Sequence, residues 1–117
     1  MLLFKKRFLP AIRQGEKTQT IRLWKHRRLR EGQRSYIPGA GYVRIAVVQP
    51  VELENLTDAD ALLDGFDTAD ALRDEIRHLY PSRLHAEYQA YRVEFELLPP
   101  AQQKKLAAEA KRRKGQA

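Results

Sequence analysis

The chain has 117 residues, no cysteine and a formal net charge of +7. This length suits one ordinary domain, which can bury a core without disulfides or a metal. The lack of cysteine excludes a disulfide framework, a thiolate zinc site and a cysteine nucleophile, and is typical of a reducing compartment. The opening residues, MLLFKKRFLP, carry charge too early for a secretory signal, and no stretch approaches the roughly 20 apolar residues of a membrane span. We therefore expect a cytoplasmic protein without membrane contact.

The charge is divided into three blocks along the chain. Residues 1–50 hold twelve Lys and Arg against two Glu, whereas residues 51–100 hold twelve Asp and Glu against four Arg. Residues 101–117 hold six Lys and Arg against one Glu. The blocks therefore carry charges of +10, −8 and +5. This division predicts one strongly positive face, suited to a polyanion, and one acidic face.

Two short elements are expected before residue 15. The apolar residues 2–4 predict a strand. A helix is expected over residues 8–14, because Pro10 lies near its start and Gly15 lies just past its end.

A strand and a loop follow. In KTQTIRLW, residues 17–24, β-branched side chains favour an extended segment with Thr18, Thr20 and Arg22 on one face. The next stretch, KHRRLREGQR at residues 25–34, is too charged to pack as core and predicts an exposed loop.

The middle of the chain predicts a hairpin followed by two helices. Residues 35–38 and 42–54 flank the turn sequence PGAG, as in a β-hairpin, and Pro50 marks the end, an edge or a bulge of its second strand. Thr57 and Thr68 are the expected N-caps of the helices.

The second of these helices carries an apolar stripe, and the last strand follows it. Leu72, Ile76, Leu79 and Tyr80 are spaced as one helix face before Pro81. In residues 91–97, apolar side chains alternate with Arg and Glu, which predicts a half-buried strand.

These elements predict an α+β fold, a small open β-barrel of about five to six strands with two to three helices. The last residues, AQQKKLAAEAKRRKGQA, favour helix but have little apolar surface. We therefore expect one domain over residues 1–98 and a basic, partly helical and partly frayed tail over residues 99–117.

One short motif carries a family resemblance. The run GEKTQTIR, residues 15–22, resembles the signature of ASCH-domain proteins, a Gly-x-Lys-x-x-Thr-[Ile/Val]-Arg run between a short helix and a strand. The similarity extends over most of residues 2–98, including LYP at 79–81 and RVEF at 92–95. It implies a PUA-like β-barrel with a cleft that relatives use to bind RNA or nucleotides. One bacterial branch is an amidohydrolase that deacetylates N4-acetylcytidine, and ribonuclease activity is attributed to another.

The resemblance also implies candidate catalytic residues. In the amidohydrolase branch a lysine, a threonine and a glutamate carry the chemistry; Lys17 and Thr20 match the first two, and the shorter carboxylate of Asp64 lies near the place of the third. Lys17 would act as base or nucleophile if burial or the neighbouring Arg22 lowered its pKa. Thr20 would orient water or donate to the oxyanion, and Asp64 would shuttle a proton. The alternative for Lys17 is an ordinary surface charge.

Other side chains are candidates for contacts with nucleic acid. The planar fork of Arg22 suits a phosphate or a base edge, although an ion pair with a carboxylate of the acidic helices is an equal alternative. The charged loop offers phosphate contacts, and aromatic side chains at its edges offer stacking faces for unpaired bases. The candidates are Lys17, Arg22, Trp24, Lys25, Arg27, Arg28, Arg30, Arg34 and Tyr36. The alternative is that Trp24 belongs to the core and the arginines only solubilise the surface.

Three functions therefore remain open. The first is binding of RNA or a nucleotide, the second is a hydrolase at the same pocket, and the third is a protein adaptor that uses the acidic helices. The three histidines lack metal-ligand spacing, and nucleotide-binding glycine motifs are missing, so we expect no metal and no cofactor. Nothing in the sequence indicates self-association, and we assume a monomer.

Overall fold

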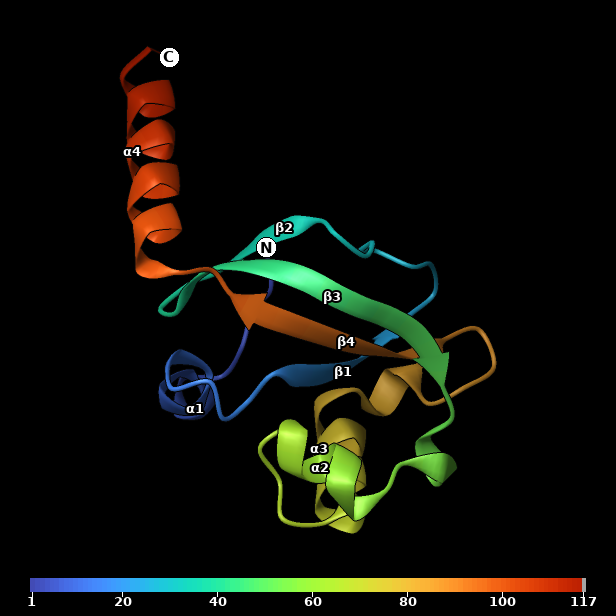
Figure 1. Ribbon diagram of the computed structural model, residues 1–117. Coiled ribbons are helices and arrows are strands. Elements are labelled where there is room, and N and C mark those ends of the chain that lie inside the picture. The colour runs from blue at the N-terminus through green and yellow to red at the C-terminus, as the bar shows by residue number, and fades with distance from the viewer. Residues whose placement is uncertain (117) are drawn as a thin grey trace.

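The computed structural model describes residues 1–116. Four antiparallel strands form one curled sheet in the order β1-β4-β3-β2 (Figure 1). The strands are β1 (Gln19–Trp24), β2 (Arg34–Ile37), β3 (Gly41–Val51) and β4 (Gln89–Leu97). The α-helices are α1 (Leu9–Arg13), α2 (Asp58–Leu63), α3 (Ala69–Leu79) and α4 (Pro100–Gln116), and single 3-10 turns cover Lys6–Phe8, Leu53–Asn55 and Pro81–Arg83.

The sheet curls into half a barrel. Strands β3 and β4 pair along most of their length, with a shift in register between Ile45 and Val47. Such a bulge bends a strand and increases its twist. Pro50 lies beyond the part of β3 that pairs with β2, so its missing N–H is tolerated at an edge.

Two apolar clusters lie on opposite sides of β1. One lies between the sheet and the N-terminal segment and includes Ile12, Trp24, Ile45 and Phe95. The other packs the sheet against α2 and α3 and consists of Ile21, Leu23, Leu56, Ala61, Leu72, Ile76 and Ala90. Because both faces of β1 are covered, polar side chains on this strand are removed from bulk water.

The two middle helices begin at the expected caps. Thr57 and Asp60 form a reciprocal capping box at the start of α2, and the Thr68 side chain accepts a hydrogen bond from the third residue of α3. The two caps are confirmed. Leu72 and Ile76 of α3 are buried as their spacing predicted, but Leu79 is 41% exposed and Tyr80 follows the helix as its C-cap, so the predicted apolar stripe is confirmed only for its first two members.

The α+β class is confirmed, but the predicted strand count is wrong. Residues 1–116 contain four strands rather than five or six, because residues 2–4 are not a strand. This segment, residues 2–4, nevertheless connects the two edges of the sheet. The Leu2 amide donates to the Tyr36 carbonyl of β2 (2.9 Å), and the Arg22 guanidinium of β1 donates to the Leu3 carbonyl (2.7 Å).

The basic tail forms one continuous helix over the described residues, so the prediction of a frayed end is wrong there. Its first turns are fixed to β3 by Gln103, whose side chain accepts from the Tyr42 amide (2.8 Å) and donates to the Tyr42 carbonyl (2.7 Å). Leu106 is also buried. Past these anchors α4 projects from the body (Figure 1). Whether the domain ends at residue 98 stays a prediction. Within residues 1–116, no helix combines the length and apolar character needed to span a membrane.

Candidate functional site

A small cavity opens where the N-terminal segment, β1, the end of α2 and α3 meet. Its volume is about 140 Å³. Apolar and polar groups both line it, and its wall is made by Leu3, Phe4, Lys5, Phe8, Lys17, Thr20, Ile21, Arg22, Asp64, Phe66, Leu72, Glu75, Ile76, Leu79 and Tyr80. The structure therefore brings Lys17, Thr20, Arg22 and Asp64 together, four residues that the sequence had singled out.

Lys17 and Asp64 form a buried ion pair in this cavity. The Nζ of Lys17 lies 2.5 Å from Oδ1 of Asp64, and it also donates to the backbone carbonyl of Asp64. The side chains are 2% and 4% exposed. Lys17 is therefore neither a solvated surface charge nor a free amine, because its ammonium is already held by a carboxylate.

Local sequence explains why these two residues meet. Asp64 caps the C-terminal end of α2, and Gly65 follows with φ = +90°, a conformation that stops the helix. A Cβ at Gly65 would lie 3.6 Å from Cδ of Lys17, so the chain passes close to the lysine stem. The Thr18 amide donates to the Leu63 carbonyl (3.0 Å), which fixes the start of β1 against the end of α2.

Gln19 completes the surroundings of Asp64. Its Nε2 donates to the Asp60 carbonyl (3.1 Å) and lies 3.4 Å from Oδ2 of Asp64. The side chain is fully buried, and its Oε1 has no hydrogen-bond partner among the described residues. No sequence pattern indicated this role, since strand alternation assigns Gln19 to the opposite face from Thr20.

Burial dominates the titration of the pair. It lowers the pKa of Lys17, with a smaller contribution from Arg22 in the same direction, while Asp64 opposes the shift. Burial likewise raises the pKa of Asp64, opposed by Lys17, Gln19 and Arg22. Each shift favours the neutral form of its group, so the two shifts together reduce the difference in proton affinity between the amine and the carboxylate.

Aromatic rings surround the lysine ammonium. Nζ of Lys17 lies 4.8 Å from the ring centroid of Phe8, 5.6 Å from that of Phe4 and 5.9 Å from that of Phe66. Ring faces attract a cation when the charge is shielded from water. They also supply flat apolar walls to the cavity. The sequence did not single out these three residues, because phenylalanine alone does not distinguish a pocket wall from a core residue.

Thr20 and Arg22 lie on the same face of β1, as predicted. Nε of Arg22 donates to Oγ1 of Thr20 (3.1 Å), and the guanidinium carbon lies 4.8 Å from the Phe4 ring centroid. Within residues 1–116, Arg22 forms no ion pair with a carboxylate, so the alternative of a scaffold ion pair is wrong. The fork is positioned by a hydroxyl, a backbone carbonyl and a ring.

A second charged group forms the rim of the cavity. Glu75 of α3 lies 3.0 Å from Nζ of Lys5 and 2.6 Å from Nη2 of Arg7. Partial burial tends to raise the pKa of Glu75, but the hydrogen bonds from Lys5 and Arg7 outweigh it and lower the pKa. Sequence patterns did not indicate this cluster, because the two basic residues lie 70 and 68 positions away from Glu75.

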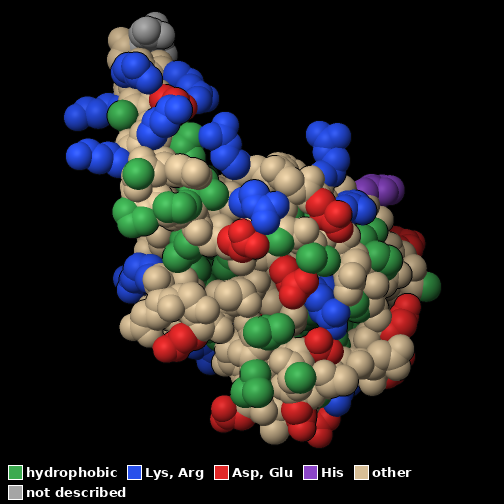
Figure 2. All heavy atoms as spheres, in the orientation of Figure 1, with side chains coloured by type: hydrophobic (Ala, Val, Ile, Leu, Met, Phe, Trp, Pro, Cys, Tyr) green, Lys and Arg blue, Asp and Glu red, His purple; other side chains and the backbone are tan. Residues whose placement is uncertain are grey.

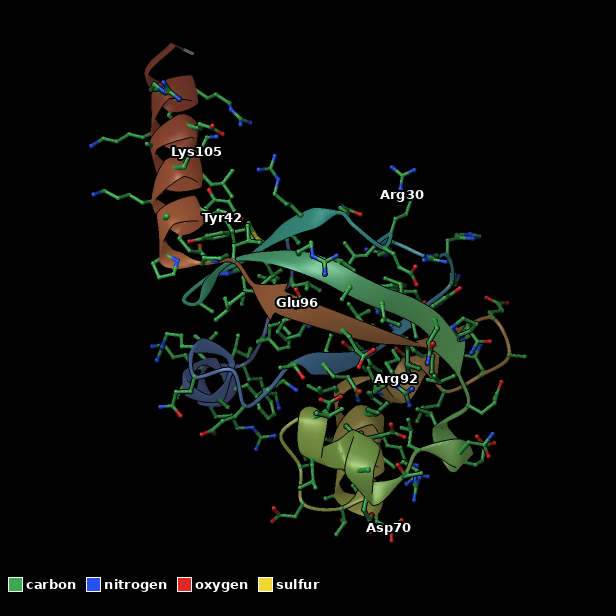
Figure 3. All side chains as sticks on the ribbon, in the orientation of Figure 1. Arg30, Tyr42, Asp70, Arg92, Glu96 and Lys105 are labelled. Atoms are coloured by element: carbon green, nitrogen blue, oxygen red, sulfur yellow. The ribbon has the colours of Figure 1, made fainter. Side chains whose placement is uncertain are left out.

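The basic loop lies outside the cavity. Residues 25–33 form the predicted irregular segment, anchored by buried Leu29, and Arg28, Arg30 and Arg34 are exposed. Arg27 donates to the Leu29 carbonyl (3.0 Å). In Figure 3, Arg30 lies at the opposite end of the molecule from Asp70.

The two aromatic candidates have different surroundings. Trp24 is 8% exposed and packs on Tyr91, with ring centroids 5.4 Å apart. The structure therefore places Trp24 in the core, and the expectation that it stacks on a base is wrong. Tyr36 is 39% exposed, and Lys25 is paired with Glu87 at 3.4 Å. In the described part of the chain, no three His, Asp or Glu side chains gather as metal ligands would.

The architecture is similar to that of two solved structures. One is a protein of Enterococcus faecalis V583 assigned to the family DUF984, with a TM-score of 0.61 and 16% identity over 79% of this chain and 67% of that one. The other is an ASCH domain of Lactobacillus crispatus JV V101, with a TM-score of 0.57 and 14% identity over 75% of this chain and 68% of that one. No family model and no curated protein sequence matches the chain.

These similarities define the fold class. The chain has an ASCH-like fold, and its half-barrel is consistent with the PUA-like architecture, with fewer strands than expected. At such low identities the likeness concerns the fold alone, so function has to be argued from the site.

Proposed function

We propose that the protein binds RNA or a nucleotide, and that the cavity around Lys17, Thr20 and Arg22 holds one nucleobase or ribonucleotide. One observation carries this proposal: a hydroxyl, a positioned guanidinium and several aromatic rings face the same small cavity. Flat apolar walls with a few convergent polar groups suit a planar heterocycle. The ASCH-like fold is compatible with such a ligand.

Charge favours an anionic ligand. The lining contains Lys5, Lys17 and Arg22 against Asp64 and Glu75. Lys17 is neutralised by Asp64, whereas the Arg22 guanidinium has only neutral acceptors in residues 1–116. Arg22 is therefore the cation available to a phosphate or a base carbonyl, which would form two parallel hydrogen bonds by replacing the Thr20 hydroxyl and the Leu3 carbonyl as acceptors.

The test is a calorimetric titration with the four ribonucleoside 5′-monophosphates. We expect Arg22→Lys, which keeps the charge but loses the fork, to weaken binding by about tenfold or more, because a hydrogen bond to a charged group contributes about 1.5–3 kcal/mol. The matched control is Arg44→Lys, a 47% exposed arginine outside the cavity. Equal affinities for the two variants, or no binding of any monophosphate, would contradict the proposal.

The exposed arginines of residues 25–34 would hold the backbone of a longer RNA. Replacing Arg28, Arg30 and Arg34 by Gln removes three charges without touching the cavity. For single strands each phosphate contact contributes about 0.7 to the salt slope of log affinity, so this variant should lower the slope by about 2. An unchanged slope would assign these arginines to solubility alone.

The buried pair favours a hydrolase as the second candidate. In the neutral form of the pair, with the shared proton on Asp64, the Lys17 amine is a base and the Asp64 carboxyl is a proton donor, and Thr20 adds a hydroxyl in the same cavity. For N4-acetylcytidine, water would add to the acetyl carbonyl as Lys17 accepts its proton, and the leaving amine would take a proton from the same pair, releasing acetate and cytidine. Incubation with N4-acetylcytidine tests this directly: no cytidine from the unmodified protein, or equal turnover by Lys17→Ala, removes the candidate.

A further inference from the structure

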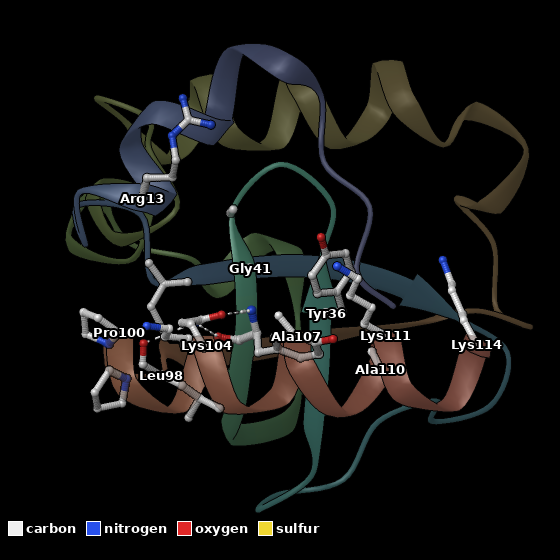
Figure 4. Close-up of a pocket in the computed structure, with 15 residues that line it drawn as sticks. Arg13, Tyr36, Gly41, Leu98, Pro100, Lys104, Ala107, Ala110, Lys111 and Lys114 are labelled. Atoms are coloured by element: carbon white, nitrogen blue, oxygen red, sulfur yellow. Dashed lines mark hydrogen bonds between the residues drawn. The ribbon is translucent and has the colours of Figure 1, made fainter. Parts of the chain in front are cut away.

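A much larger groove lies between α4 and the β2–β3 hairpin (Figure 4). Its volume is about 1040 Å³. The floor is formed by the hairpin around Gly41 and the end of β4, and one wall is a face of α4. Tyr36 of the hairpin and Arg13 of α1 also line the groove.

The groove is a formed feature and not a frayed end lying near the sheet. Gln103 holds both backbone groups of Tyr42, and its Nε2 also donates to the Leu98 carbonyl (3.1 Å). Gly41 has φ = +123°, and a Cβ there would lie 2.7 Å from Oε1 of Gln103. The hairpin turn therefore accepts α4 only because Gly41 leaves room for the clamp.

The charges facing the groove have one sign. The charged residues that line it are Arg13, Lys104, Lys111 and Lys114, and this lining, within residues 1–116, contains no Asp or Glu. Lys104 and Lys111 are seven residues apart on the same helix, a separation of about 10 Å along the axis. Figure 2 shows the Lys and Arg side chains gathered over α4.

Two tyrosines add stacking faces to this row of cations. Tyr36 and Tyr42 are cross-strand partners on the hairpin, with ring centroids 4.8 Å apart and planes inclined by 57°. Tyr36 retains 39% exposure. Cations in a row beside exposed rings match the phosphates and unpaired bases of a single strand, whereas the bases of a duplex are already stacked and cannot use the rings.

We propose that this groove binds a single-stranded RNA segment, with Lys104, Lys111 and Lys114 on the phosphates and Tyr36 on a base. The site is separate from the cavity around Lys17 and does not require a ligand there. Together the two sites would let the protein hold a nucleotide in the cavity and a strand in the groove.

The experiment measures fluorescence anisotropy of a labelled oligouridylate of about twelve nucleotides, at about 50 and about 200 mM salt. The groove variant replaces Lys104, Lys111 and Lys114 by Gln. The control replaces Lys105, Arg112 and Arg113 by Gln, which removes the same charge from the same helix but from residues outside the groove. We expect the groove variant to lose about tenfold or more in affinity and about 2 in salt slope, and the control to lose much less.

A second variant tests the stacking contact. Tyr36→Leu keeps an apolar partner for Tyr42 but loses the ring, so affinity should fall by about tenfold while the salt slope stays unchanged. Circular dichroism of each variant establishes that it is folded.

Several outcomes would overturn the proposal: equal losses for the two triple variants, equal affinity for a duplex of the same length, or no binding at either salt concentration. So would self-association that the groove variant abolishes, which would assign the groove to a second copy of the chain. Mononucleotide binding by the cavity is measured separately, so either site can fail without the other.

Discussion

Removing the ammonium of Lys17 should destabilise the fold strongly. In Lys17→Met the carboxylate of Asp64, 4% exposed, would remain buried with Gln19 as its closest polar partner. Breaking a buried ion pair on one side costs about 3–5 kcal/mol. With a urea m-value of about 1–3 kcal/mol/M, the unfolding midpoint should fall by roughly 2 M. Trp24, the single tryptophan, is buried and reports unfolding by fluorescence.

The double variant Lys17→Met with Asp64→Asn distinguishes the cost of leaving one charge unpaired from the cost of removing both charges. Replacing both charges by neutral groups of similar size is often close to neutral for stability, so the double variant should recover most of the loss. Burial raises the pKa of Asp64 and Lys17 opposes that shift, so the pKa should rise further when the ammonium is removed. A carboxyl group with a raised folded pKa contributes stability that is present below its unfolded pKa and is lost as pH rises through its folded pKa. The deficit of Lys17→Met should therefore shrink as pH is lowered.

Two results would refute this reasoning. A loss below about 1 kcal/mol for Lys17→Met would mean that the pair is open to water, contrary to its burial. A double variant as unstable as the sum of the single variants would mean that the two charges do not interact.

Three further changes test other parts of the structure. Gly65→Ala should cost about 1–2 kcal/mol in thermal unfolding, because φ is +90° there, and no loss would mean that the turn is not left-handed. Thr68→Ala should lower the free energy of urea unfolding by about 1 kcal/mol, because it removes the N-cap of α3. An unchanged midpoint would mean that the Thr68 side chain does not stabilise the helix start. Lys5 and Arg7 lower the pKa of Glu75, so this carboxylate adds stability above its unfolded pKa, and that stability is lost as pH falls through the folded pKa. Glu75→Gln should therefore flatten this part of the dependence of unfolding free energy on pH. An unaltered pH dependence would contradict the ion pairs.

Local chemistry explains which parts of the fold were predictable. The caps at Thr57 and Thr68 and the alternating last strand depend on neighbours in sequence. The strand predicted over residues 2–4 is absent for a different reason. These residues are apolar enough for a strand, but they make only isolated contacts with the two sheet edges, and no local sequence pattern distinguishes such a connecting segment from a strand.

The sequence predicted which residues form the site but not how deeply they are buried. The motif indicated Lys17, Thr20 and Arg22, yet the burial of Lys17 depends on Phe4, Phe8 and Phe66, which come from three separate segments. The burial of Trp24 was likewise not predictable from its neighbours in sequence. Its position beside a basic loop favoured nucleic-acid contact, but both faces of β1 are covered, so its ring belongs to the interior.

The N-terminal segment, residues 2–4, has a consequence for dynamics. It joins β2 through the Leu2 amide and β1 through Arg22, and its Phe4 ring forms part of the cavity wall. Local unfolding of this segment would break its contacts with both edge strands and remove part of the cavity wall in one step. An occupant that contacts both Arg22 and Phe4 would slow that event, so hydrogen exchange at the Leu2 amide would report occupancy from outside the cavity.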